Sequence, residues 1–129
     1  MDSSIWIAYF RDPEARVGIH LQRLVDAGEA FVAGPVLYEV LQGTRSPREF
    51  EVAFAHLQGL PYLIVNGTTW VSAAGMAAGL LRRGVTLPMT DVLLATLARE
   101  NGCQVWSADA HFQQIPGARL YRPPDPRIR

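Results

Sequence analysis

Short apolar runs alternate with helical patterns along the chain, and this alternation restricts the possible folds more than any other feature. Strand-like runs occur at 30–33, 62–65, 104–106 and 119–121, with helical segments between them. Strands that are joined by helices pair in parallel, because a helical crossover returns the chain to the same end of the sheet. The sequence therefore predicts an α/β fold in which helices cover both faces of a mostly parallel sheet.

Helix-start and helix-stop residues mark the helical segments. Ser46 and Glu49 have the spacing of a capping box, and Thr90 is the expected N-cap of the last long helix. In the helix over 68–83, the apolar stripe expected to face the core is Val71, Ala74, Ala78 and Leu81. The predicted helices begin after Asp2 and then cover 14–27, 35–42, 46–57, 68–83 and 90–100, with a helical turn at 110–114.

The composition is that of an ordinary globular domain and argues against membrane-spanning and disulfide-rich classes. Of 129 residues, 49% are hydrophobic and 19% are charged, and the longest apolar runs are too short to cross a bilayer. The one cysteine, Cys103, allows no internal disulfide and is expected to be a small core residue. We therefore expect a cytoplasmic protein without membrane association, with one domain over 1–122 and an irregular proline-rich tail over 123–129.

Four acidic residues lie where an apolar segment meets a loop or a helix. They are Asp2, Glu39, Asp91 and Asp109. A carboxylate among apolar neighbours costs free energy unless something compensates its charge. The simplest shared partner for converging carboxylates is a divalent metal ion bound by oxygen ligands. The pattern therefore predicts a metal site for phosphoryl transfer, near the edge of the sheet where the strands end.

Each of these acids also has a structural explanation. Asp91 lies in the first turn of a predicted helix, where an acid stabilises the helix dipole by roughly 0.3–1 kcal/mol. Asp109 could cap the turn that follows it, and Asp2 could belong to a frayed terminus. Glu39 could lie on a solvated helix face, although its helix is otherwise apolar. Only the convergence of all four would separate a metal site from these alternatives.

The basic residues are all arginine, and the formal net charge is zero. If four carboxylates bind metal, the remaining surface carries about four positive charges, which suits a polyanionic substrate. Arg82 and Arg83 are candidate phosphate contacts, and a solvated helix end is the alternative for both. The three histidines do not have metal-ligand spacing, but His111 is two residues from Asp109 and is a candidate for contact with substrate.

Four segments together carry a resemblance to a known family. DSSIWI, YEVLQG, RRGVTLPMTDVLLATLA and SADAHF resemble, in order and spacing, the motifs of PIN-domain ribonucleases. Size and motif order are most similar to the VapC-type toxins of bacterial toxin–antitoxin pairs. The resemblance implies a three-layer α/β/α sandwich around a mostly parallel sheet, a homodimer, and inhibition by a cognate antitoxin protein.

The same resemblance implies a role for each acid. Asp2, Glu39, Asp91 and Asp109 match the acidic catalytic site, and Ser4 matches a supporting hydrogen-bond donor. Asp2, Asp91 and Asp109 are then expected to bind Mg²⁺ or Mn²⁺, directly or through water, while Glu39 completes the shell or positions the attacking water. The implied activity is metal-dependent hydrolysis of RNA phosphodiester bonds.

Two departures from the family pattern leave an alternative open. Only Met1 precedes Asp2, where relatives carry an apolar strand, and His111 stands where many relatives carry another acid. Either the chain starts further upstream or its first strand is shortened. A catalytically inert PIN-like module that binds RNA or protein is therefore the alternative. A receiver-type signalling domain is disfavoured, because it needs a lysine and this sequence has none.

Overall fold

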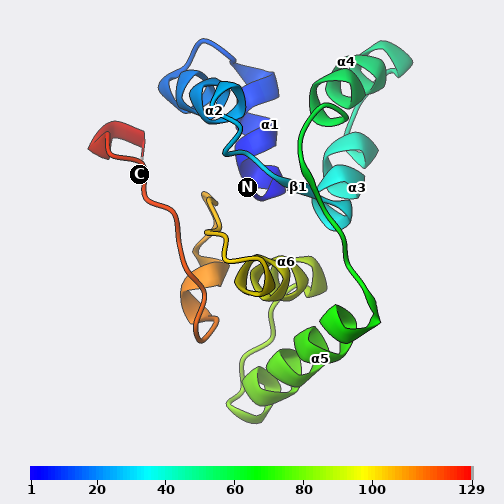
Figure 1. Cartoon of the computed structure of the whole chain (residues 1–129), viewed down its shortest axis with the longest axis vertical. Coiled ribbons are helices and arrows are strands. Elements are labelled where there is room, and N and C mark those ends of the chain that lie inside the picture. Colours follow the sequence, from blue (N-terminus) through cyan, green and yellow to red (C-terminus); the bar gives the residue numbers. More distant parts are fainter. Residues whose placement is uncertain (129) are drawn as a thin grey trace.

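The computed structural model describes residues 1–128, in which helices surround a small parallel sheet (Figure 1). The helices are α1 (Ser3–Arg11), α2 (Arg16–Asp26), α3 (Gly34–Gln42), α4 (Pro47–Leu57), α5 (Gly67–Arg82) and α6 (Met89–Glu100). The strands are β1 (Val32–Ala33) and β2 (Tyr62–Leu63), and two 3-10 turns are η1 (Ala110–Gln114) and η2 (Pro126–Ile128). No helix within residues 1–128 is long and apolar enough to span a membrane.

The sheet has two short parallel strands. Strand β1 pairs with β2, with Val32 opposite Tyr62. Val105 forms a separate parallel bridge with Leu120. The predicted strands thus lie where expected and run in the predicted direction, but they are shorter. A strand extends only as far as a neighbour accepts its hydrogen bonds, and Ile64, already 72% exposed, lies beyond the pairing.

Helix α6 forms the centre of the core. Its residues Val92–Ala98 are all buried, as expected of a helix covered on every side. One core cluster joins α6 to α1, α2, α3 and the sheet, and a smaller cluster lies between α5 and α6. The predicted α/β class, with a parallel sheet between helices, is confirmed.

Of the two helix caps predicted from the sequence, the one at Ser46 is present and the one at Thr90 is not. The Ser46 hydroxyl accepts the Glu49 N–H at 3.1 Å, as a capping box requires. The Glu49 carboxylate, however, accepts the N–H of Arg45 at 2.7 Å, one residue earlier than in a complete box. The prediction for Thr90 was wrong, because α6 begins one residue earlier and its N-cap is Pro88. Thr90 instead hydrogen-bonds to the Glu39 side chain.

The apolar stripe predicted for α5 was also wrong. Val71 is 73% exposed and Leu81 59% exposed, whereas the buried residues of this helix are Thr69, Ala73 and Leu80. Small and apolar residues surround much of α5, so the pattern did not select one face. A polar contact helps to fix its rotation, because the buried Thr69 hydroxyl donates to the Glu100 carboxylate at 2.7 Å.

The proline-rich tail is more ordered than expected over residues 123–128. Pro123 is buried, and η2 packs beside α2. The Arg127 guanidinium forms an ion pair with Asp125 at 2.8 Å. This pair lowers the pKa of Asp125 to about 2. Residue 129 lies outside the described residues, and the domain boundary at residue 122 remains a prediction.

Candidate acidic site

The four predicted acids come from four separate elements. Asp2 is the N-cap of α1 and Asp109 is the N-cap of η1, and each accepts a backbone N–H from its own turn at 3.0 Å. Asp91 lies in the first turn of α6, and Glu39 lies within α3. Three of the acids therefore sit at helix N-termini, where aligned N–H groups favour negative charge. The capping roles considered from the sequence exist, but they do not explain why the acids converge.

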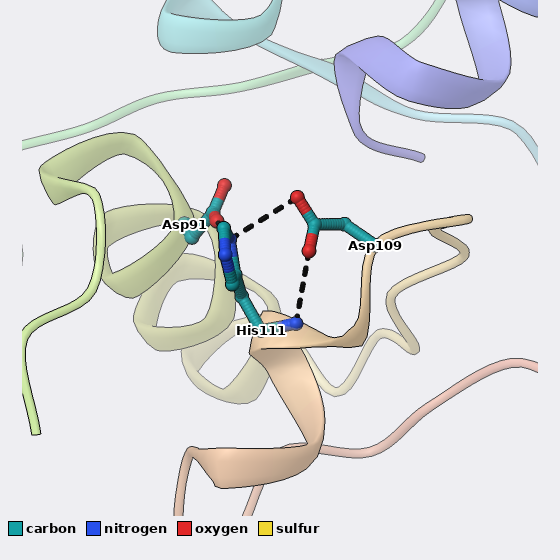
Figure 2. Close-up of side chains that lie close together, drawn as sticks. All are labelled: Asp91, Asp109 and His111. Carbon is teal, nitrogen blue, oxygen red and sulfur yellow. Dashed lines mark hydrogen bonds and ion pairs between the residues drawn. The ribbon is translucent and has the colours of Figure 1, made fainter.

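Asp91, Asp109 and His111 form a compact cluster. Each offers one potential ligand atom, and these atoms all lie within 4.8 Å of one another. The His111 Nδ1 atom is 2.8 Å from Asp91 Oδ2 and 3.1 Å from Asp109 Oδ2. Figure 2 shows the imidazole ring beside both carboxylates, with Asp91 on α6 and Asp109 on the loop before η1. This cluster is the one group among residues 1–128 whose geometry suits a metal ion.

Asp2 is the most enclosed of the four acids, with 6% of its surface exposed. Its carboxylate accepts hydrogen bonds from the hydroxyls of Ser4 and Ser107 as well as from the Ser4 N–H. Ser4 Oγ also accepts the N–H of Ala108 at 3.0 Å, and Ser107 Oγ accepts the N–H of Asp109 at 2.8 Å. These serines therefore link the start of α1 to the segment that carries Asp109.

Two contacts were missed by the sequence reasoning. Ser107 lies two residues before Asp109 in the segment SADAHF, and that spacing was the available signal. Thr90 is next to Asp91 and hydrogen-bonds to Glu39, so it connects α6 to α3. The bond from Ser107 to Asp2 and the bond from Thr90 to Glu39 do not follow from local sequence, because each joins elements that are distant along the chain.

The charges of these acids affect the ionisation of Asp91 and Glu39. Burial raises the pKa of Asp91, the hydrogen bond from His111 lowers it, and the charges of Asp109 and Asp2 raise it again. Burial likewise raises the pKa of Glu39, which the Thr90 hydrogen bond lowers and the charges of Asp91 and Asp2 raise. Carboxylates that disfavour one another's ionisation in this way are stabilised by a shared cation.

His111 lies directly against the carboxylates of Asp91 and Asp109. Its hydrogen bond to Asp91, followed by the charge of Asp109, raises the pKa of the imidazole although its side chain is 41% exposed. The ion pairs that Asp91 and Asp109 make within residues 1–128 are both with His111. Its ring nitrogen and the carboxylate oxygens form a donor set that suits Mn²⁺, while the carboxylates alone suit Mg²⁺.

The predicted phosphate contacts lie outside this cluster. Arg82 is the last residue of α5, Arg83 is its C-cap, and both are exposed. Neither forms an ion pair with the acids in the part of the chain that the structure describes. Their role in substrate binding stays a prediction.

The chain belongs to the PIN domain family, whose pattern matches residues 1–118. The resemblance drawn from the four motifs is thereby confirmed. VapC ribonuclease Mb1587 of Mycobacterium bovis is 29% identical over 119 residues, which are 89% of each chain. Ribonuclease VapC11 of Mycobacterium tuberculosis is similar to the same extent.

A solved structure shares the fold. In VapBC2 from Rickettsia felis bound to a DNA fragment from their promoter, one chain superposes with a TM-score of 0.79. The match covers 92% of this chain and 93% of that one at 15% sequence identity. An identity this low supports the fold alone, which is the predicted PIN-like α/β architecture.

Proposed function

We propose that this chain is a metal-dependent endoribonuclease that hydrolyses RNA phosphodiester bonds and acts as the toxin of a toxin–antitoxin pair. The observation that carries the proposal is the cluster of Asp91, Asp109 and His111. The charge of Asp2 raises the pKa of Asp91, and the charges of Asp91 and Asp2 raise the pKa of Glu39, which supports a shared acidic site. Similarity over 89% of the chain to proteins named VapC ribonucleases supports the proposal.

Asp2, Asp91 and Asp109 are the residues that would hold Mg²⁺ or Mn²⁺, because they present carboxylate oxygens to a common region. A bound ion of this kind lowers the pKa of coordinated water and stabilises charge on a phosphodiester. Ser4 and Ser107 hold the Asp2 carboxylate in a fixed orientation, so its position is set before any ion binds.

Glu39 is suited to position the attacking water and to accept its proton. Its pKa is raised by burial and by the neighbouring acids, so this carboxylate is a better proton acceptor than an exposed glutamate. The Thr90 hydroxyl orients it from the opposite helix. His111, at the exposed side of the cluster, donates to Asp91 and is placed to contact a substrate phosphate.

Protein partners are also part of the proposal. Large apolar side chains are exposed on α4 and α5, including Phe50, Phe54, Trp70 and Val71. Phe50 and Phe54 are four residues apart and lie on one face of α4, as apolar side chains at an interaction surface do. They support assembly with a second copy of the chain and with a cognate antitoxin.

The direct test is cleavage of total RNA by the purified chain with Mg²⁺, with Mn²⁺ and with a chelator. Asp91→Asn is expected to reduce cleavage by more than about 100-fold, because replacement of even an outer-shell partner of a metal ligand typically costs 10–100-fold. Glu51→Gln, an exposed acid on α4, is the matched control and should cleave at the parental rate. Wild-type cleavage by Asp91→Asn would contradict the proposal, and RNA binding without cleavage under every condition would support the inert module instead.

A further inference from the structure

A cavity of about 460 Å³ opens beside the acidic site. Asp109, a member of the compact cluster, lines this cavity, and so does Ser107, whose hydroxyl donates to the Asp2 carboxylate. Phe112 and Gln113 of η1 also line it. The acidic site and this cavity, called the η1 cavity below, therefore share one segment of the chain.

Apolar side chains from distant segments line much of the η1 cavity. Ile5 and Ala8 of α1, Val17 of α2, and Leu120 near the end of the chain all contribute to it. Its volume falls within the range of about 300–1,000 Å³ that is typical of small-molecule sites, which are mostly apolar with a few polar groups. The cavity is therefore large and apolar enough for a flat group such as a nucleobase.

Arginines of the C-terminal segment bring positive charge to the same cavity. Arg122 and Arg127 line it, and Figure 1 shows their segment passing from η1 to α2. Arg127 is paired with Asp125 at 2.8 Å. Arg122 is exposed and forms no ion pair with another of residues 1–128. Its guanidinium is therefore available to an anion, and a guanidinium binds phosphate oxygens through two parallel N–H groups.

The proposed metal ligands, an apolar space and an arginine thus lie next to one another, and this order matches a polynucleotide. A phosphodiester held at the acidic site has a base on one side and a further phosphate beyond it. Only a single strand offers such a base, because the bases of a duplex are paired and stacked. An apolar peptide would fill the space, but it would bring no phosphate to Arg122. A single-stranded nucleic acid is therefore the better match.

We propose that the η1 cavity binds one base of a single-stranded RNA, next to the bond that the acidic site cuts. Arg122 binds an adjoining phosphate, and the exposed Gln113 amide donates to and accepts from the edge of the base. The inference rests on the proposed function, because it takes the cleaved RNA as the ligand. Binding is nevertheless measured without cleavage, so the two can fail separately.

The first experiment measures the binding of a short, fluorescently labelled single-stranded RNA by anisotropy, in a chelator so that no bond is cut. Arg122→Gln is expected to weaken binding by about tenfold, the effect of losing one charge-assisted contact. It should also reduce the slope of log K against log salt by about 0.7, because one phosphate contact fewer releases fewer counterions. Arg48→Gln, an exposed arginine of α4 that does not line the cavity, is the matched control and should change neither quantity.

The second experiment tests the apolar space and the recognition of the base. Ala8→Leu places a larger side chain in the cavity and should weaken binding by about tenfold, whereas Ala55→Leu, exposed on α4, should not. Gln113→Ala should reduce the differences in affinity among homopolymers of A, C, G and U. The thermal midpoint of Arg122→Gln and of Gln113→Ala, and its rise with Mn²⁺, should match the parent.

The proposal is overturned if Arg122→Gln and Arg48→Gln bind RNA alike, if the parent binds no RNA, or if a fully paired duplex binds as well as the single strand. It is also overturned if Ala8→Leu folds and binds like the parent. If Ala8→Leu does not fold, an unchanged base preference in Gln113→Ala overturns it instead. Failure of the proposed function gives another result, in which the parent binds RNA through Arg122 but does not cut it with Mg²⁺ or Mn²⁺.

Discussion

The two sides of the acidic site stabilise their carboxylates in different ways. On one side Asp2 is buried, and its charge is stabilised by neutral donors, the hydroxyls of Ser4 and Ser107. On the other side Asp91 and Asp109 are bridged by His111, a titratable group that is 41% exposed. The serine side is fixed by hydrogen bonds from neutral donors. The histidine side is held by a charge that can be lost or replaced.

The difference suggests how the site is prepared for an ion. Fixed neutral donors orient one carboxylate in advance, so little reorganisation is needed there when a cation arrives. The two carboxylates near His111 are more accessible, because Asp109 is 39% exposed. We expect a metal ion to take the place of the proton that His111 shares with these carboxylates. Four experiments can break or sharpen the comparison.

The largest effect should come from metal binding to the protein without RNA. Mn²⁺ is expected to stabilise the folded chain by roughly 2.7 kcal/mol when the free ion is at about 100 times its Kd. Asp91→Asn should abolish this gain, because it removes one of the carboxylates that are proposed to hold the ion. Thermal unfolding with increasing Mn²⁺ measures the effect, and Glu51→Gln is the control. If Mn²⁺ raised the thermal midpoint of Asp91→Asn as much as that of the parent, the ion would bind at another site.

The two sides should differ in what they contribute to stability. Asp2→Ala leaves two serine hydroxyls without their acceptor in a buried place and should cost about 1–3 kcal/mol of unfolding free energy. Asp109→Ala removes a half-exposed cap of a short turn and should cost at most about 1 kcal/mol. Urea denaturation of both variants gives the comparison. Equal losses would mean that the serine side is no more preorganised than the histidine side.

Ser107 tests the orientation of Asp2 without removing a charge. Ser107→Ala should lower stability by about 1 kcal/mol and reduce RNA cleavage by roughly 10–100-fold, the usual cost of losing a group that orients a ligand. Ser72→Ala, on the exposed face of α5, is the matched control and should stay within about 0.5 kcal/mol of the parent. Full activity in Ser107→Ala would show that cleavage does not depend on the hydrogen bond from Ser107 to Asp2.

The smallest effect is the pH dependence of the histidine side. The pKa of His111 is raised in the folded protein, so its contribution to stability is fully present below the unfolded pKa of about 6.5. The contribution is lost as the pH rises through the raised value. Without metal, His111→Gln should therefore lower the thermal midpoint at pH 5.5 and leave it nearly unchanged at pH 9. A difference that is independent of pH would show that the ring acts only by packing.

Signals that operate within one turn were predictable from the sequence. Gly28 and Gly102, which follow the ends of α2 and α6, have φ angles of 73° and 65°, which favour glycine over residues with a side chain. The Ser46 cap formed because its hydroxyl needs only the N–H of Glu49, three residues later. By contrast, Thr90 was taken as a cap from its neighbours, while its hydroxyl is engaged by Glu39 on another helix.

The sequence by itself determined which segments are helical, to within a few residues at their ends, and which four acids were candidates for one site. Both depend on the order of residues and on the cost of an anion among apolar neighbours. Only the tertiary structure decided the face that α5 buries, the length of the strands, and the bonds made by Ser107 and His111. Those features arise from contacts between segments far apart in the chain, and their geometry exists only after the helices have packed around α6.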